Sequence, residues 1–270
     1  MKELEVLNEC LSLFSTDEQE LHIINSFNDV PISLKLLDLV DGDRTFKRST
    51  FSSAWQDIWN ISVFVERMDW LRNGVIEGHI EESRWRHYTQ VDIGSFHVEI
   101  RSAMDHVAEI IADFSNLNGK LPTSFNRLQQ RIDKYSTKLD PEIVKLIKEA
   151  SWFSDIRHVR DSLVHHGGDT LVFCGAKEGI TFQIYNDFVH NQVNKSLFMY
   201  NQNVAYFEKY AALYFSHLLV FLNNLGNILL SKIPKRTSGC RSYAQGFKTL
   251  HKWTTGLRDE LLVQNEIQKA

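Results

Sequence analysis

The chain has 270 residues, of which 43% are hydrophobic and 24% are charged, a composition that is ordinary for a soluble globular protein. Its net charge of −4 argues against a protein that coats nucleic acid without specificity. Cys10, Cys174 and Cys240 are too far apart for a zinc site or a disulfide framework, so we expect a reducing, cytoplasmic setting. Because there are only 13 glycines and 4 prolines, the sequence favours long helices over strands.

We expect residues 1–50 to lie against the main body of the protein instead of forming a domain. Residues 1–17 have apolar side chains at helical spacing, which predicts a short amphipathic helix. The stretch from there to about Phe46 mixes strand-like and loop-like pieces, with Pro31 and Asp41-Gly42-Asp43 as turn signals. The acidic residues that follow Met1 do not fit a signal peptide.

Two long helices are predicted next. The first begins near Ser52, a break is expected between Asn73 and Gly78, and the second helix runs from about Gly94 to Ser115. Both have apolar residues at helical spacing, which are Ala54, Ile58, Ile61, Val65 and Met68 in the first and Phe96, Ile100, Val107 and Ile111 in the second.

Polar residues of the second long helix follow a spacing of four. His97, Arg101 and Asp105 are therefore expected to share its more polar side. His97 and Glu99 do not indicate a metal site, because no second pair of ligands stands at a useful spacing. We interpret these residues as a charged flank of the helix.

After a loop, a helix is predicted over residues 125–132. Asp140 and Pro141 then start another helix, since a capping acid followed by proline is a favoured beginning. Ile143 and Ile147 carry the apolar stripe of this helix towards the next segment, so we expect one continuous or slightly kinked element.

The segment that ends at Gly167-Gly168 carries the main candidate residues. It has an apolar stripe at helical spacing, formed by Trp152, Ile156, Val159 and Leu163. The glycine pair supplies the left-handed residue that ends a helix, which places His165 and His166 in or just beyond the last turn. The carbonyl groups at a helix end stabilise a protonated histidine and hold its titration near neutral pH.

The period of the apolar residues changes to two after Gly168, which predicts a β-hairpin between about Thr170 and Tyr185. From Val204 to Ile228 the period is again helical. The stretch from 210 to 231 lacks charged residues, but its serine, histidine and asparagines favour a buried core helix over a membrane span. Residues 233–270 read as a basic, helical C-terminal tail.

An arginine and a histidine are sufficient for one kind of chemistry, the cleavage of RNA by its own 2′-hydroxyl. A histidine of near-neutral pKa can take or give the proton, and a guanidinium can stabilise the charge on the phosphorane oxygens. The sequence has no glycine-rich phosphate loop, no Cys-His metal cluster and no G-x-S-x-G elbow, so no cofactor and no metal are expected.

The pattern Arg160-Asp161-x-x-x-His165 resembles the R-x4-6-H signature of HEPN domains, a helical superfamily of nucleotide-binding proteins and ribonucleases. The resemblance covers about Thr50 to Ser231. It implies an all-α fold in which residues 51–232 form an antiparallel helical bundle with a small β-hairpin insertion after the signature helix. It further implies a metal-independent endoribonuclease that cleaves single-stranded or looped RNA in a toxin or defence role, with an antitoxin or regulatory protein as partner.

The resemblance also assigns roles to residues. His165 is the expected general acid/base, Arg160 the cation that stabilises the phosphorane, and Asp161 the residue that orients Arg160. Arg157 and His166 are expected to contact the substrate. Residues five apart on an ideal helix point about 140° from each other. Arg160 and His165 therefore converge only if the last turn unwinds or if two such helices meet across a twofold axis, as in the homodimers typical of HEPN ribonucleases.

Simpler interpretations of the same residues lead to other functions. Arg157 and Asp161 could form an ordinary i,i+4 ion pair, and the histidines could cap carbonyl groups. The protein would then be a non-catalytic helical module that binds RNA, a nucleotide or a protein partner, or a purely structural dimerisation protein.

The stretch from 209 to 258 contains basic residues but no acidic ones. We expect its positive charge either to face a polyanion or to offset the acidic N-terminal residues within the fold itself.

Overall fold

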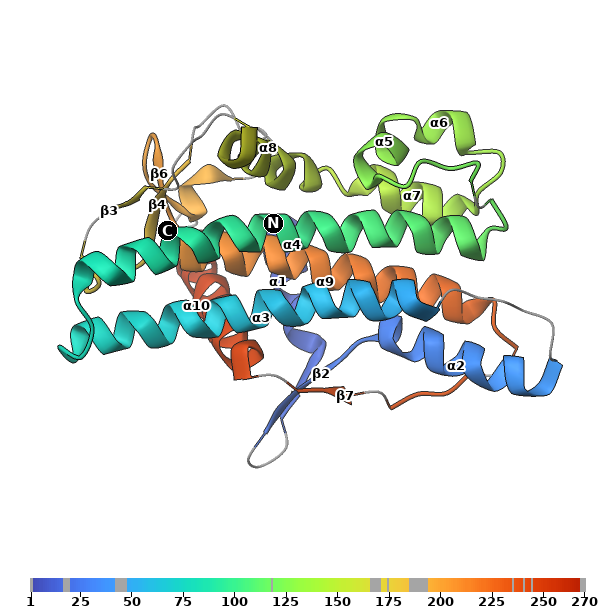
Figure 1. The fold of residues 1–270 in the computed structure, drawn as a ribbon, viewed down its shortest axis with the longest axis horizontal. Helices are drawn as coiled ribbons and strands as arrows, with labels where there is room; N and C mark the ends of the chain where they lie inside the picture. Colours follow the sequence, from blue (N-terminus) through green and yellow to red (C-terminus); the bar gives the residue numbers. More distant parts are fainter. Residues whose placement is uncertain are drawn as a thin grey trace.

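Helices dominate the computed structural model of the chain (Figure 1). The described residues are 2–16, 20–41, 48–117, 119–165, 171–173, 175–184, 194–234, 236–239, 241–243 and 245–267, with the backbone alone described at 36–41, 48 and 163–165. The predominantly α-helical character that the sequence predicted is confirmed.

Two long helices form an antiparallel hairpin (Figure 1). They are α3 (Arg48–Ile76) and α4 (Glu82–Phe114). The break predicted near Gly78 is the turn between them, and this glycine has φ of 79°, a left-handed conformation that it adopts without strain. The second helix begins at Glu82 instead of Gly94, because Trp85 and Thr89 extend its buried face towards the turn.

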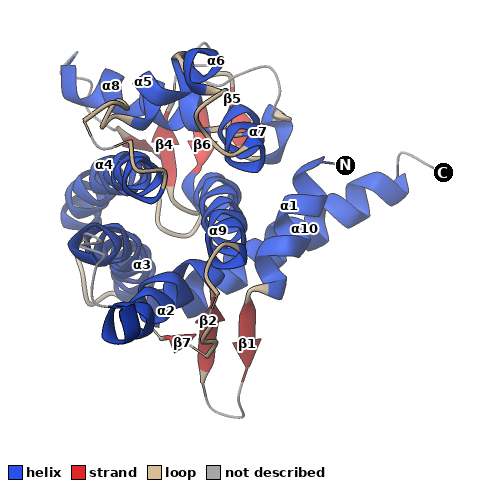
Figure 2. Cartoon of the chain, turned by 90° about the vertical axis from the view of Figure 1, so that its right-hand side faces the viewer, coloured by secondary structure: helices blue, strands red, loops and turns tan. Residues whose placement is uncertain are grey.

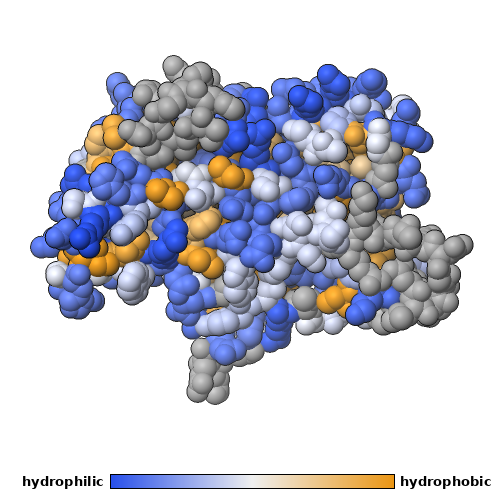
Figure 3. All heavy atoms as spheres, viewed as in Figure 1, coloured by the Kyte–Doolittle hydropathy of each residue, from blue (hydrophilic) through white to orange (hydrophobic). Residues whose placement is uncertain are grey.

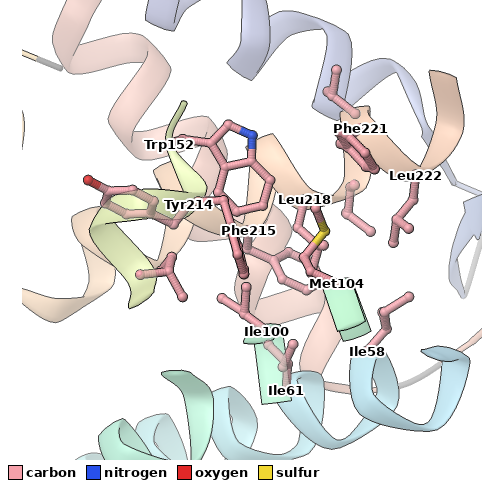
Figure 4. Close-up of a cluster of buried hydrophobic side chains, with 14 of the residues drawn as sticks. Ile58, Ile61, Ile100, Met104, Trp152, Tyr214, Phe215, Leu218, Phe221 and Leu222 are labelled. Atoms are coloured by element: carbon pink, nitrogen blue, oxygen red, sulfur yellow. The ribbon is translucent and has the colours of Figure 1, made fainter. Parts of the chain in front are cut away.

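The helix α9 (Phe207–Ser231) is the centre of the hydrophobic core. It packs against α1 (Lys2–Ser12), α2 (Ser26–Asp41) and α10 (Gln245–Ile267). Figure 2 shows α2, α3, α4 and α9 nearly end-on, as a bundle. In Figure 4 the side chains of Leu218 and Phe221 from α9 lie in one cluster with Ile58 of α3 and Met104 of α4. Truncating a buried leucine of this kind to alanine costs about 2–5 kcal/mol.

Within the described part of the chain, α9 is the one helix that is long and apolar enough to span a membrane. Of its most apolar stretch, 72% is buried inside the protein, as in the core helix of a soluble fold. The prediction of a buried core helix is confirmed. On the α1 side, Cys10 is fully buried against α9, where burial raises the pKa of its thiol to about 12.

Residues from all three expected regions of the chain contribute to this core. In the first region, α2 contains Pro31, which the sequence predicted to interrupt regular structure. Phe27, Val30 and Leu34 recur at helical spacing and are buried, and this packing outweighs the lost hydrogen bond of the proline. In the last region, Gly246 of α10 lies so close to Ser62 of α3 that a Cβ atom would stand 1.6 Å from the serine carbonyl oxygen.

Two small antiparallel sheets correct the expected all-α architecture with a single hairpin. The predicted hairpin exists as β3 (Val172–Phe173) and β4 (Thr181–Gln183), but β4 also pairs with β6 (Val204–Tyr206), which pairs with β5 (Met199–Asn201). The helical period predicted from Val204 starts three residues too early, because this short strand leads directly into α9 at Phe207. The second sheet consists of β1 (Phe14–Thr16), β2 (Leu21–Ile24) and β7 (Arg241–Ser242).

Four shorter helices cover α4 and α9 (Figure 1). They are α5 (Phe125–Gln130), α6 (Ile132–Tyr135), α7 (Pro141–Glu149) and α8 (Phe153–His165). As predicted, Asp140 caps α7, because its Oδ1 accepts a hydrogen bond from the Glu142 backbone N–H at 2.8 Å. The expected continuity of α7 and α8 is wrong. The Gln129 amide donates to the carbonyl oxygens of Ile147 and Ala150, both at 3.0 Å, and so ends α7 there.

Candidate functional site

The helix α8 lies on α4 and exposes its charged residues beside that helix. Ile156 and Val159 belong to the apolar stripe of α8 and are buried, so this side of the helix faces the core. The side chains of Arg160 and Asp161 are partly exposed, at 20% and 36%. The apolar stripe predicted from the sequence therefore decides which residues of α8 reach solvent.

Two guanidinium groups converge on the carboxylate of Asp161. Arg160 of α8 donates from Nη1 to Asp161 Oδ1 at 3.1 Å, and Arg101 of α4 donates from Nη1 to the same oxygen at 3.5 Å. Arg101 also approaches Asp105, with 3.9 Å between Nε and Oδ2. The carboxylate of Asp161 thus holds two cations together that would otherwise repel each other. Arg101 and Asp105, which the sequence placed on a helix flank, belong to this cluster.

An open hollow of about 350 Å³ adjoins the cluster. Its lining consists of Arg160 from α8 and of Val98, Arg101, Ser102, Asp105, His106 and Glu109 from α4. Acidic and basic groups are nearly balanced there, so the hollow is suited to one or two specific contacts with an anion and not to general binding of polyanions.

Figure 3 shows the face of the molecule around α3 and α4, where isolated apolar patches lie among polar side chains.

His106 is a residue of this hollow that the sequence did not single out. Its Nε2 lies 3.7 Å from Oδ2 of Asp57, which belongs to α3 and is almost fully buried. Burial raises the pKa of Asp57, and hydrogen bonds from Ser102 and Glu99 act against that rise. No local pattern could reveal this histidine–aspartate pair, because the pairing depends on the register of α3 against α4.

The other candidate residues of α8 are placed only in part. Arg157 does not pair with Asp161; its Nη2 lies 2.6 Å from Nε2 of the neighbouring His158. The simple i,i+4 ion pair is therefore absent from the described contacts of this helix. Residue 165 is the last of α8, so the helix does not unwind between Arg160 and His165. The side chain of His165, the whole of His166 and the Gly167-Gly168 pair lie outside the described residues.

Two buried polar pairs join α9 to α4 and to α8. His97 is fully buried, contrary to the expected polar flank; its Nδ1 lies 2.7 Å from the Ile93 carbonyl oxygen and its Nε2 lies 3.0 Å from the Tyr210 hydroxyl. Burial lowers the pKa of His97 to about 4, so the ring is neutral at neutral pH. Tyr214 donates to Oδ2 of the buried Asp155 at 2.8 Å.

Basic residues of the stretch from 209 to 258 pair with acids from other parts of the fold. Lys209 Nζ lies 2.7 Å from a carboxylate oxygen of Glu260, and Lys232 forms an ion pair with Asp140. These contacts offset part of the positive charge within the protein itself. Among the described residues, no group of three or more histidine, cysteine, aspartate or glutamate side chains is arranged to hold a metal ion.

No family model, curated protein or solved structure matches this chain. The chemistry of the site therefore rests on its own geometry. Arg160 and Arg101 can bind an anion, Asp161 fixes both guanidinium groups, and His106 can exchange a proton beside them.

Proposed function

We propose that the protein is a HEPN-like, metal-independent endoribonuclease that cleaves single-stranded or looped RNA by 2′-hydroxyl transesterification. The convergence of Arg160 and Arg101 on Asp161, at the edge of an open hollow, is the observation that carries this proposal. A fixed pair of guanidinium groups can stabilise a phosphorane, whose charge is greater than that of the ground-state phosphodiester.

The proposed reaction breaks the bond between phosphorus and the 5′-oxygen and forms one between phosphorus and the 2′-oxygen. His165 acts as general acid/base, and His106, which lines the hollow with Arg160, is the second group for proton transfer. One of them takes the proton of the 2′-hydroxyl, and the other gives a proton to the departing 5′-oxygen. Arg157 and His166 contact neighbouring groups of the RNA. The products carry a 2′,3′-cyclic phosphate and a 5′-hydroxyl.

A homodimer would complete the site. Positions 160 and 165 of an ideal helix point about 140° apart, and the backbone of α8 is helical over both positions. Beside the hollow, Val91 and Val98 of α4 are 64% and 41% exposed and stand seven residues apart, on one face of the helix. We propose that a second copy covers this face and that its α8 supplies the His165 for the Arg160 of the first chain.

The proposed biological setting follows from the HEPN resemblance. A ribonuclease of this kind acts as a toxin or in defence, is held in check by an antitoxin or regulatory protein, and works in the cytoplasm, where its RNA substrates are. The free thiol of Cys10 is in keeping with a reducing compartment.

The decisive experiment is a cleavage assay on a fluorescently labelled, looped RNA in excess EDTA, with analysis of the product ends. Arg160→Ala and His165→Ala should each abolish cleavage, while Arg131→Ala, at an exposed residue between α5 and α6, should have no effect. His106→Asn should slow cleavage strongly, because the amide cannot transfer a proton. Circular dichroism and sedimentation would verify fold and dimer for every variant.

Two results would contradict the enzymatic proposal. One is RNA binding without cleavage by the purified protein, which would identify the non-catalytic binding module. The other is a His165→Ala variant that cuts as well as the parent.

A further inference from the structure

A second cavity lies near the first turn of α8, among α1, α7 and α9. Figure 2 shows α1 and α7 on the same side of α9. The cavity measures about 370 Å³, which lies within the roughly 300–1,000 Å³ of small-molecule sites. Arg160, Arg101 and the other residues of the hollow take no part in its lining, so it is a separate site.

The walls of this pocket are mainly apolar and include a stacked pair of rings. The rings of Trp152 and His217 are nearly parallel, with an angle of 14° and 5.8 Å between their centroids. Val6 of α1 and Phe221 of α9 extend the apolar surface. In Figure 4, Trp152 and Phe221 belong to the same cluster of side chains. A flat ligand can therefore contact aromatic and aliphatic groups on several sides.

His217 offers hydrogen-bonding capacity that the described residues do not use. Burial lowers the pKa of this histidine to about 4, so its ring is neutral at neutral pH and does not repel a cation. A neutral imidazole has one N–H donor and one acceptor nitrogen. His217 forms no hydrogen bond with the described residues, and both nitrogens are therefore available to a ligand.

Carboxylates surround the pocket. Its lining includes Glu3, Glu5, Glu9, Glu149 and Asp155, and Lys2 is the one basic residue among the described residues of the lining. Asp155 is fully buried and fixed by the Tyr214 hydroxyl. The described carboxylates are not grouped closely enough to hold a metal ion. Their negative potential therefore favours a cation whose charge is spread over several N–H groups.

We infer that this pocket binds a small organic cation with N–H donors on a flat apolar body, such as an aromatic amidine or guanidine. The flat body contacts Trp152, whose ring also attracts a cation. The N–H groups of the cation donate to the acceptor nitrogen of His217 and to the carboxylates. This site is independent of the proposed cleavage of RNA.

The test compares three probes of nearly equal shape by isothermal titration calorimetry at neutral pH. Benzamidine is cationic, benzamide is its neutral counterpart and benzoate is anionic. Benzamidine should bind at least about tenfold more tightly than benzamide, a difference of roughly 1.4 kcal/mol, and benzoate should not bind measurably. Glu9→Gln and His217→Leu should each weaken the binding of benzamidine several-fold. Glu77→Gln, an exposed control at the turn between α3 and α4, should leave it unchanged.

Equal binding of benzamidine and benzamide would overturn the inference, as would the absence of binding at millimolar benzamidine. An unchanged affinity in Glu9→Gln and His217→Leu would place the ligand elsewhere and would also overturn it. Urea unfolding of each variant separates weaker binding from a loss of fold. If His217→Leu does not fold, Glu3→Gln together with Glu9→Gln provides the same test, because both residues line the pocket.

Discussion

The hollow beside Arg160 and the pocket beside Asp155 are built on the same helix but have opposite chemistry. In the hollow, guanidinium groups from α4 and α8 are held by Asp161 and face solvent. In the pocket, a neutral histidine stacks on Trp152 among apolar groups and carboxylates. The difference arises from the neighbouring helix, since α4 presents polar residues to one region of α8 and α9 presents mostly apolar residues to the other. A change in one region should therefore leave the other unaffected.

The largest effect is expected for Arg160→Lys in the hollow. The variant keeps the charge but loses the planar fork that can contact Asp161 and a phosphate together, so cleavage of RNA should fall by roughly a hundredfold or more. The urea midpoint and the affinity for benzamidine should not change. Arg131→Lys serves as the matched control. Cleavage by Arg160→Lys at the parent rate would show that the fork has no role.

Tyr214→Phe should have the reverse pattern. It removes the hydroxyl that donates to the buried Asp155, and loss of a buried hydrogen bond to a charged group costs about 2 kcal/mol. Urea unfolding should detect this loss, whereas the rate of RNA cleavage stays within a factor of two or so of the parent. Tyr200→Phe, at an exposed position of β5, should leave stability unchanged. A stable Tyr214→Phe that fails to cleave would mean that the two regions are coupled.

The pH dependence of stability should depend on the buried histidines. Burial lowers the pKa values of His97 and His217 from 6.5 to about 4, so between these limits the unfolded chain binds protons that the native protein does not bind. The free energy of unfolding should therefore fall as pH is lowered from about 6.5 to about 4, by up to about 1.4 kcal/mol per pH unit for each histidine.

His217→Gln should remove the part of this slope that comes from the pocket. Tyr200→Phe, at an exposed residue, removes no group that titrates in this pH range, so it provides the control and should not alter the slope. Urea unfolding at several pH values measures both variants. Identical slopes for His217→Gln and the parent would mean that folding does not lower the pKa of His217.

The smallest effect is expected for Asp161→Asn. The amide still fits the site but no longer neutralises Arg160 and Arg101, so both guanidinium groups are held less firmly and cleavage should fall by about tenfold. Stability should change by less than about 0.5 kcal/mol, because the ion pairs are partly exposed. Asp133→Asn, at a surface ion pair with Lys148, gives the reference value for such a change. A faster Asp161→Asn variant would show that Asp161 competes with the substrate for Arg160.

Periodicity predicted the long helices well, because a continuous apolar stripe has few alternatives to burial. It placed Ile58 and Ile61 in the core of α3 and found the capping role of Asp140. It failed where a few residues decide the structure, as in the strands of 199–206 and in α2, whose packing outweighs Pro31. Short strands take their partners from distant parts of the chain, and local spacing does not contain that information.

The candidate site shows the same limit. Arg160 and Asp161 could be proposed from the sequence, since they follow from the pattern within one helix. Arg101 joins them only because α4 lies beside α8, and His106 meets Asp57 only because of the register of α3 against α4. His97 and Arg101 share a spacing of four, yet one is fully buried and the other reaches solvent. Whether a residue on this side of α4 is buried depends on what packs against that part of the helix.

The buried thiol of Cys10 makes the opening of α1 measurable. This helix forms one wall of the pocket, and its cysteine, deeply buried against α9 with a pKa of about 12, reacts with an alkylating reagent only when α1 separates from α9. In a protein with Cys174→Ser and Cys240→Ser, the alkylation rate therefore reports how readily α1 separates from α9. A ligand bound in this pocket would slow the alkylation of Cys10, whether or not the protein has any catalytic activity.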